Sequence, residues 1–337
     1  MSKLITILAV IPDHLDGTSF YRGVGPLANL KKRHGLNISI VYPSEVNWSV
    51  CAPCDVLFLQ RPFLDQHVNI LKIAKRRNLP IWVDYDDDLF SVGTDNPTHY
   101  IYSKPSIQRN IAELLTNADV VTVSTQAIKA KYDQFNKNVH VVNNGIDVSV
   151  LKYRVSNEKM IERNPLVMWR GSQTHTKDVL SVANEILETH DENPDLIFEF
   201  LGDRQFLLTE QMKSNQLIFT PWSDCDSFME HIYQRRPKAF IVPLVFSNFN
   251  RAKSNIAYLE SAFAGAVSIV PNLPEFVQPG ALVYSSQAEF KDHLKTVVNL
   301  NDSDHLYYAK LAWKNVTENF TLDTINLKRK TLLESML

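Results

Sequence analysis

The chain has 337 residues, of which 45% are hydrophobic and 21% are charged, and its formal net charge is −2. This length favours about two domains, and the near-neutral charge gives no support to a broad surface for nucleic acid or an acidic polymer. No apolar run approaches the roughly 18 residues of a membrane span. The short run Leu4–Ile11 ends at Pro12 without the small-residue cleavage site of a signal peptide, so we expect a soluble, cytoplasmic protein.

The first half of the chain alternates apolar, β-rich runs with amphipathic segments. We expect strands at Leu4–Val10, Ile38–Tyr42, Val56–Leu59, Ile81–Asp84, Val120–Ser124 and Val139–Val142. Helical patterns fill the gaps, at Tyr21–Arg33, Val68–Arg76, Ser106–Leu115 and Gln126–Gln134. Strands that alternate with helices in this way predict a parallel, doubly wound sheet.

The alternation breaks at the turn signal Asn143-Asn144-Gly145 and at the polar stretch 156–164, and then restarts. Further strands are expected at Leu166–Trp169, Ile197–Leu201, Leu217–Thr220, Ala239–Pro243 and Val267–Val270. Further helices are expected at Lys177–Glu188, Asp226–Tyr233, Asn255–Ala264 and Gln287–Val298, and the tail Ser303–Leu337 is expected to be helical throughout.

These patterns predict an α/β protein of two Rossmann-like, doubly wound domains that face a central cleft, a common place for a ligand. We place residues 1–155 in the first domain and residues 156–318 in the second. The C-terminal helices are expected to pack back on the first domain, with residues 319–337 as the returning segment.

Cys51 and Cys54 have the spacing of a redox pair, but two free thiols in a loop are the favoured interpretation. A structural zinc site needs four ligands, and the sequence has no second pair. The two thiols also precede a strand, whereas ligands in open parallel sheets bind beyond the carboxyl ends of strands.

A helix start rich in positive charge lies at residues 250–260, NRAKSNIAYLE. Arg251 and Lys253 precede Ser254 and Asn255, two residue types that favour the N-cap of a helix. The amino end of a helix carries unpaired N–H groups and the positive end of the helix dipole, which suit a phosphate group.

Glu260 falls about 40° from Ile256 around this helix, within its apolar stripe. It also lies about 9 Å along the axis from Ser254, six residues earlier at about 1.5 Å per residue, which is near the distance from a diphosphate to the ribose hydroxyls of a nucleotide. Glu260 could therefore accept both hydroxyls of a ribose. The pattern leaves open a second interpretation, a partly buried glutamate paired with a cation from a neighbouring loop.

Residues 249–271, FNRAKSNIAYLESAFAGAVSIVP, resemble the donor-site segment of GT-B glycosyltransferases. The similarity is greatest to the large retaining class that builds bacterial surface polysaccharides, the group-one or family-four-like class. Members carry a Lys-Ser, a helix ending in Leu-Glu, and then a Gly and a Val-rich strand. The resemblance implies that Lys253, Ser254 and Asn255 bind the diphosphate of a nucleotide sugar and that Glu260 binds its ribose.

The segment MWRGSQTHTKD resembles the strand and loop that open the second domain of these enzymes. The resemblance implies that Arg170 neutralises phosphate charge during catalysis, as Lys253 does. It also implies that Gly171, Ser172 and His175 line the donor site. For His175 a helix-cap or surface histidine is the alternative.

Two further short segments match positions where such enzymes hold the base of the nucleotide. They are LGD, with Gly202 and Asp203, and TPW, with Trp222. Packing in the core is an equal alternative for Trp222.

In the first domain, the glycine-bearing segment GTSFYRGVGPLANL enters a helix and provides Tyr21, Arg22 and Gly23 as acceptor-side residues. An ordinary strand–helix turn is the alternative. LQRP at residues 59–62 and NNGID at residues 143–147 also match the family pattern.

The acidic segment VDYDDDLF follows an expected strand. It could bind a divalent metal, and Asp-x-Asp is the metal motif of GT-A glycosyltransferases, but that fold has a single domain. We favour Asp84 and Asp86 directed inward, with Asp84 as an acceptor-side residue and Asp86 as a catalytic residue at the position where many relatives place a histidine on the donor sugar. Asp87 and Asp88 are expected to cap a helix start. We predict no metal and no cofactor beyond the nucleotide sugar.

The sequence departs from the family at one position. Many retaining members have two glutamates with seven residues between them, and the first of these positions is Ala252 here. Asn248 or Asn250 is a possible substitute, and we include Asn250 among the donor-binding residues.

The resemblance implies a retaining, metal-independent transfer of a hexosyl or pentosyl group from a nucleotide diphosphate sugar to a hydroxyl acceptor. The acceptor class stays open among a glycan, a lipid-linked glycan, a protein and modified DNA. The basic runs Lys31–His34 and Lys75–Arg77 could contact a membrane surface, although solvated helix faces are favoured.

Two other functions remain open, a two-lobed small-molecule binding protein and a GT-B-fold sugar-nucleotide epimerase or hydrolase. A Glu260 carboxylate held in an internal ion pair, with the gap between the lobes sealed by side chains, would count against the donor site.

Overall fold

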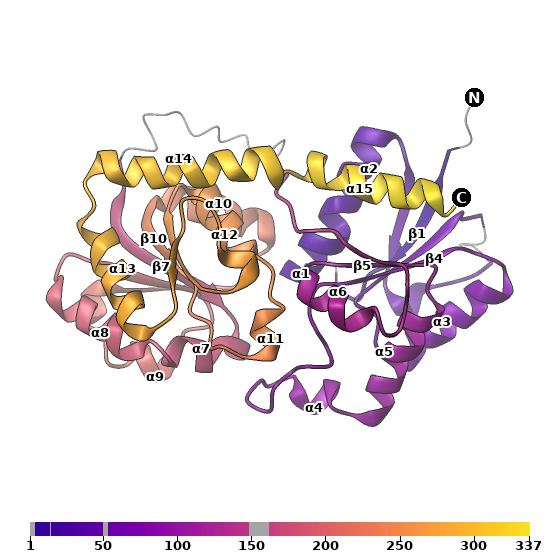
Figure 1. Ribbon diagram of the computed structural model, residues 1–337, viewed down its shortest axis with the longest axis horizontal. Helices are drawn as coiled ribbons and strands as arrows, with labels where there is room; N and C mark the ends of the chain where they lie inside the picture. Colours follow the sequence, from indigo (N-terminus) through magenta and orange to yellow (C-terminus); the bar gives the residue numbers. More distant parts are fainter. Residues whose placement is uncertain (1–3, 14, 50–52, 148–161) are drawn as a thin grey trace.

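The computed structural model describes residues 4–13, 15–49, 53–147 and 162–337, and it shows two α/β domains side by side (Figure 1). The first contains a parallel sheet in the order β2-β1-β3-β4-β5-β6. Its strands are β1 (Thr6–Val10), β2 (Asn37–Val41), β3 (Val56–Gln60), β4 (Ile81–Tyr85), β5 (Val120–Val123) and β6 (Val139–Val141). Its main helices are α1 (Gly17–Ser19), α2 (Gly25–His34), α3 (Asp65–Arg76), α4 (His99–Tyr102), α5 (Pro105–Asn117) and α6 (Gln126–Tyr132).

The second domain repeats the plan, with the strand order β12-β11-β10-β7-β8-β9. Its strands are β7 (Asn164–Gly171), β8 (Ile197–Gly202), β9 (Leu217–Pro221), β10 (Pro237–Ile241), β11 (Val267–Pro271) and β12 (Leu282–Tyr284). Its helices are α7 (Thr176–Leu180), α8 (Ala183–Glu192), α9 (Phe206–Thr209), α10 (Cys225–Arg235), α11 (Asn248–Arg251), α12 (Ile256–Ala264), α13 (Gln287–Asn299), α14 (Asp302–Asn319) and α15 (Leu322–Ser335).

The sheets form because their strands are apolar on both faces, as parallel sheets covered by helices require. In the first sheet, Leu57 and Leu59 pack in one buried cluster, whereas Val56 and Phe58 pack in the cluster on the other face. The expected strands are all present. Strand β12 was not predicted, because its three residues are too few to show an apolar pattern.

The segment between β1 and α2 contains a π-helical turn, Phe20–Val24, where the sequence predicted regular helix. The N–H of Gly25 donates to the carbonyl of Phe20, five residues back. A Cβ at Gly25 would lie 2.6 Å from that carbonyl oxygen, so only glycine fits. Single π turns within helices often mark functional sites, and this one orients Tyr21 and Arg22.

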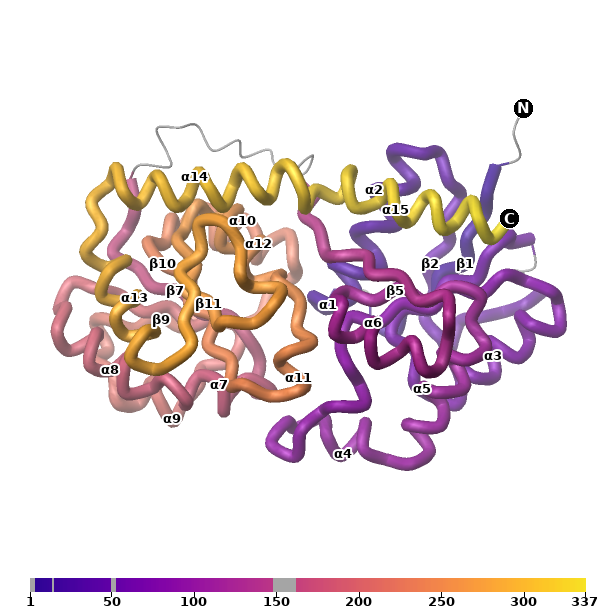
Figure 2. Tube along the Cα trace, in the orientation of Figure 1, coloured from indigo at the N-terminus to yellow at the C-terminus, as the bar shows by residue number. Residues whose placement is uncertain are grey.

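The C-terminal helices join the two domains (Figures 1 and 2). Helix α14 lies on the second domain, and α15 packs against α2 of the first. The prediction of continuous helix over 303–337 is wrong at Phe320 and Thr321, where the chain pairs with Ile146: the Ile146 N–H donates to the carbonyl of Phe320, and the Leu322 N–H to that of Ile146. The expected helix 177–188 is likewise divided into α7 and α8.

No helix in the described part of the chain is long and apolar enough to cross a membrane. Cys51 and most of the polar stretch 156–164 lie outside the described residues. Cys54 is half-buried. The basic run 75–77 is exposed at the end of α3, where the Lys75 amine donates to Asn117.

Asn326 anchors α15 to the first domain. Its amide nitrogen donates to the Pro26 carbonyl at 3.0 Å and to Asn29 Oδ1 at 2.7 Å, and its oxygen accepts from buried Arg329. Asn326→Ala leaves these buried groups unpaired, so we expect the free energy of unfolding to fall by about 1–3 kcal/mol. Urea unfolding measures it. Leu327→Ala, at an exposed position of the same helix, is the control and should change it by less than about 0.5 kcal/mol.

Candidate functional site

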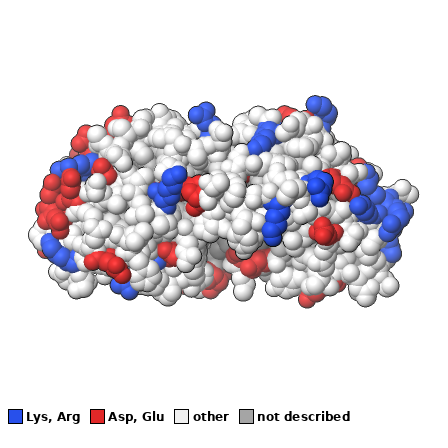
Figure 3. Space-filling model, turned by 90° about the horizontal axis from the view of Figure 1, so that it is seen from below, with Lys and Arg blue, Asp and Glu red and all other residues white. Residues whose placement is uncertain are grey.

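Two sets of charged side chains meet where the domains face each other, at the carboxyl ends of both sheets. One set joins Lys253 of the second domain to the acidic residues that follow β4. The other joins Tyr21 of the first domain to Glu260 on α12. Viewed from below, a groove runs between the domains with acidic side chains beside it (Figure 3). The carboxyl ends of strands are where open α/β sheets bind ligands.

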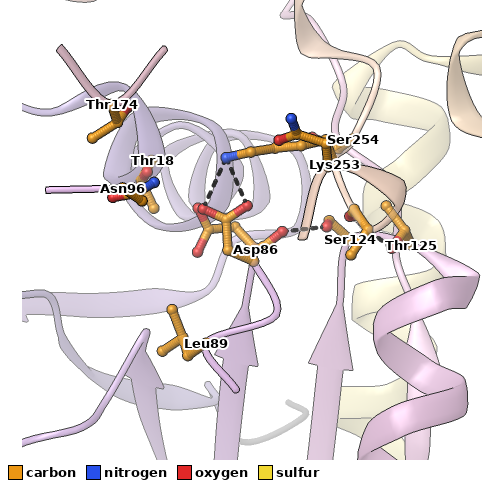
Figure 4. A network of polar contacts seen from close by, with 12 residues as sticks. Thr18, Asp86, Leu89, Asn96, Ser124, Thr125, Thr174, Lys253 and Ser254 are labelled. Atoms are coloured by element: carbon orange, nitrogen blue, oxygen red, sulfur yellow. Dashed lines mark hydrogen bonds and ion pairs between the residues drawn. The ribbon is translucent and has the colours of Figure 1, made fainter. Parts of the chain in front are cut away.

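Lys253 forms an ion pair across the domain boundary. Its amine lies 3.1 Å from Oδ1 and 3.3 Å from Oδ2 of Asp87, and 4.5 Å from the centre of the Phe249 ring. Figure 4 shows the amine over the acidic residues at the end of β4, where the Ser124 hydroxyl also donates to the Asp86 carbonyl. Burial acts to raise the pKa of Asp87, but Lys253 and Arg61 together hold that pKa below its ordinary value.

Arg61 is the second cation of this set. The sequence pointed to it only as part of the LQRP segment, and we predicted no role for it. Its guanidinium lies 3.2 Å from Asp87 and 3.5 Å from Asp86. Burial raises the pKa of Asp86, although Arg61 opposes the shift. The backbone of Arg61 is left-handed, with φ 45°, a strained conformation for a non-glycine residue that clusters at functional sites.

The assignment of roles to the acidic residues needs correction. Asp87, which we expected to cap a helix start, pairs instead with Lys253 of the second domain. Asp88 does act locally, since it accepts from the Phe90 N–H and pairs with Lys131 at 3.0 Å.

Glu260 is 2% exposed and holds two partners. Its Oε2 accepts from Arg170 Nε at 2.7 Å, and its Oε1 accepts from the Tyr21 hydroxyl at 2.9 Å. Burial raises the pKa of Glu260, although Arg170 and Tyr21 act against the shift. The interpretation of a glutamate paired with a neighbouring cation is therefore what the structure shows. A ribose at Glu260 would have to replace the Tyr21 hydroxyl.

The start of α12 carries the remaining predicted phosphate ligands. Asn255 occupies the N-cap position as expected, but its side chain makes no capping bond. It is 1% exposed, and its amide nitrogen has no partner among the described residues. Ser254 accepts from Asn144 of the first domain at 2.8 Å, so this loop is fixed from both sides.

The position of the missing glutamate lies in the domain contact. Ala252 is buried against the apolar cluster of the first domain, and its carbonyl accepts from the Thr125 hydroxyl at 3.1 Å. The suggested substitute Asn250 is 5% exposed, and its amide nitrogen donates to Asp178 and to the Val245 carbonyl. That nitrogen is therefore engaged within the protein, and the contact of Asn250 with the donor stays a prediction.

His175 belongs to the same network. It lies at the end of a short 3₁₀ turn that Ser172 caps, and its Nδ1 lies 2.9 Å from Asp178 Oδ2. Asp178 is 4% exposed and was not among the residues predicted for the site. Its position three residues after His175 was the available signal.

The residues expected around a base lie together at the ends of β7, β8 and β9. Gly202 has a φ of 94°, and a Cβ there would lie 2.8 Å from the Trp222 ring. Trp222 is 65% exposed, which excludes the core-packing alternative. The Asp203 N–H donates to the Gly171 carbonyl, which joins the two loops.

The prediction that Arg22, Gly23 and Asp84 line the cleft is wrong. Arg22 and Asp84 are each 1% exposed and form a buried, two-pronged ion pair, at 2.9 and 2.6 Å. Arg22 also donates to Asn144, and Gly23 is packed against Ile11. An uncompensated aspartate inside a strand would be costly, so the arginine is drawn inward.

Replacing Tyr21 by Phe removes the hydroxyl that donates to Glu260. A buried carboxylate oxygen then lacks its donor, so we expect the free energy of unfolding to fall by about 1–3 kcal/mol, measured by urea unfolding. Tyr307→Phe, at a 62% exposed position, is the matched control. Equally small effects for both variants would contradict a strong bond between the domains.

Comparison with known proteins places the fold. No protein-family model and no curated protein sequence matches the chain. Solved structures that match nearly the whole of it include HepE from Anabaena in complex with UDP, sucrose-phosphate synthase from Thermosynechococcus elongatus, and an alpha-glucosyltransferase in complex with UDP-glucose and DNA containing an abasic site.

The TM-scores of these structures are 0.65, 0.72 and 0.68, and their sequence identities are 14%, 11% and 11%. The match covers 99%, 99% and 98% of this chain and 100%, 99% and 99% of the respective structures. With its two facing parallel sheets and returning C-terminal helix, the chain has the GT-B fold, as the sequence predicted.

Proposed function

We propose that the protein is a glycosyltransferase that moves a sugar from a nucleoside diphosphate donor to a hydroxyl group. The observation that carries the proposal is that Lys253, just before α12, and the Arg170–Glu260 pair further along this helix both lie on the boundary between the domains. Lys253 and Arg170 would bind the diphosphate, and Glu260 would bind the ribose. Helix amino ends with adjacent cations favour phosphate groups.

Lys253 and Glu260, which would bind the donor, each already contact another side chain of the protein. Asp87 holds Lys253, and the Tyr21 hydroxyl holds Glu260. An incoming diphosphate would take the place of the Asp87 carboxylate on Lys253, and a ribose hydroxyl would take the place of the Tyr21 hydroxyl. The Asn255 amide nitrogen, buried without a partner in the described chain, would gain a phosphate oxygen as acceptor.

The comparisons support a nucleotide at this kind of site. HepE was solved with UDP and the alpha-glucosyltransferase with UDP-glucose. We extend this to a UDP-type donor as the first candidate for the present chain. The transferred group is a hexose or pentose, and the acceptor is a hydroxyl compound among the classes named above.

Charge stabilisation is the main chemistry that these residues could supply. As the glycosidic bond breaks, negative charge develops on the leaving diphosphate, and Lys253 and Arg170 are fixed where they would stabilise it. The leaving phosphate can itself accept the proton of the attacking hydroxyl, so no separate base is required. We propose retention of configuration and no metal, as the resemblance to the retaining class implies. Asp86, whose pKa burial raises, would face the transferred sugar.

A donor screen tests the function. Thermal unfolding with UDP, GDP, ADP, dTDP and their sugars should show stabilisation by one nucleotide class, since a ligand that binds only the folded state stabilises it. Stabilisation by free sugars alone would favour a binding protein. Release of free sugar, or conversion of the donor without acceptor, would identify a hydrolase or epimerase.

Lys253→Ala and Glu260→Gln should each weaken donor binding at least tenfold in calorimetric titration, about 1.4 kcal/mol. The matched control is Arg251→Ala, which removes an exposed cation two residues from Lys253 and should leave the affinity unchanged. Unchanged affinity in both site variants would refute the site.

Asp87→Asn should strengthen the binding of nucleoside diphosphate instead of weakening it. The variant removes the internal anion that competes for Lys253, so we expect nucleoside diphosphate to bind about threefold or more tightly, as measured by the same titration. Asp88→Asn is the control, because the partner of Asp88 is Lys131 of the same domain. Weaker binding by Asp87→Asn would mean that Asp87 assists the ligand instead of competing with it.

A further inference from the structure

Asp178 connects two loops of the second domain that the proposed donor would contact. One carboxylate oxygen, Oδ1, accepts from the Val245 N–H at 2.8 Å and from the Asn250 amide at 2.9 Å. The other, Oδ2, lies 2.9 Å from Nδ1 of His175. Asp178 thus joins the loop after β7, which carries His175, to the segment after β10 that leads to Lys253.

These contacts determine where the proton lies on His175. An ionised carboxylate only accepts hydrogen bonds, so the ring nitrogen that faces Asp178 must carry the hydrogen. Burial lowers the pKa of His175, and the charges of Lys253 and Arg170 act in the same direction, against Asp178. The ring is therefore neutral near pH 7, and Nε2 is a bare acceptor.

The His175 ring is partly exposed and lies near charged residues of both domains. The His175 side chain is 22% exposed, and Nε2 has no hydrogen-bond partner among the residues that the structure describes. The charged groups that act on the ring are Asp178, Lys253 and Arg170, and the ring in turn acts on Asp87. A bare acceptor beside these groups cannot donate to a phosphate oxygen, but it can accept from a hydroxyl group.

We propose that Asp178 is a positioning residue that holds His175 as the Nδ1–H tautomer, so that Nε2 accepts a hydrogen bond from a hydroxyl group of the transferred sugar. The ligand half of this inference rests on the proposed function. The tautomer half rests only on the contacts of Asp178 and can be tested without a ligand.

Asp178→Asn reverses the hydrogen bonding without changing the shape of the side chain. Two donors, Val245 N–H and the Asn250 amide, face the Oδ1 position, so the amide oxygen of the substituted side chain should turn to them. Its NH₂ group then faces Nδ1 of His175, which must become an acceptor, and the proton moves to Nε2. ¹⁵N NMR of the histidine rings, with His175 assigned by loss of its signals in His175→Gln, measures this directly.

The chain provides an internal control for the NMR measurement. His190 also pairs through Nδ1 with an aspartate, Asp191, and its Nε2 accepts from the Lys213 N–H at 3.0 Å. Asp191 is exposed, and Asp191→Asn should leave the His175 signals unchanged. A protonated Nε2 on His175 in the wild type at pH 7, or no change in Asp178→Asn, would overturn the tautomer assignment.

Binding of UDP, UDP-glucose and its monofluorinated analogues tests the ligand half, because fluorine cannot donate a hydrogen bond. We expect the wild type to bind one analogue at least tenfold more weakly than UDP-glucose. Asp178→Asn should lose most of this discrimination while its affinity for UDP stays within twofold. An equal loss of UDP affinity would assign Asp178 a purely structural role, and equal binding of all analogues by the wild type would overturn the hydroxyl contact.

If the wild type binds neither UDP nor UDP-glucose, the proposed function with a UDP-type donor fails, together with the sugar contact. The NMR result still decides the tautomer. The two failures are therefore distinguishable.

Discussion

The arrangement of the two domains depends on an ion pair and a hydrogen bond between side chains on opposite sides of their boundary. Lys253 and Glu260 belong to the second domain, and each is held by a side chain of the first, Asp87 and Tyr21. Charged groups that lose water when two domains come together are costly unless they are paired. The two domain surfaces can therefore meet only where each buried cation has an anion beside it. On the proposed function, a phosphate group at this boundary would replace the Asp87 carboxylate on Lys253, which would link ligand binding to contact between the domains.

Buried hydrogen bonds of the first domain fix the position of the loop that carries Lys253. Arg22 and Asp84 form an ion pair inside the first domain, and Arg22 also donates to Asn144. Asn144 in turn donates to Ser254, beside Lys253. A continuous set of hydrogen bonds therefore runs from the interior of the first domain to the start of α12. Arg22 and Asp84, which we predicted on the acceptor side, instead support the loop that carries Lys253.

Much of the fold could be predicted from the sequence, because strand and helix patterns are local and the parallel sheets bury both faces. The site was less predictable. The segment around Lys253 and Glu260 was found by its helix-start chemistry, but no local pattern shows that Asp87, and not Asp86, crosses to Lys253. The same holds for the inward turn of Arg22, which follows from a π-helical turn and a buried aspartate, and for Arg61, whose position depends on a left-handed backbone.

A crystal structure of the protein with UDP tests the central claim most directly. The account predicts the diphosphate on Lys253 and the amino end of α12, the ribose on Glu260, and Asp87 and the Tyr21 hydroxyl displaced from their present partners. A structure with UDP bound elsewhere, and with the Lys253–Asp87 and Tyr21–Glu260 contacts unchanged, would contradict it. These contacts would then be part of the protein's permanent architecture and not the place of a ligand.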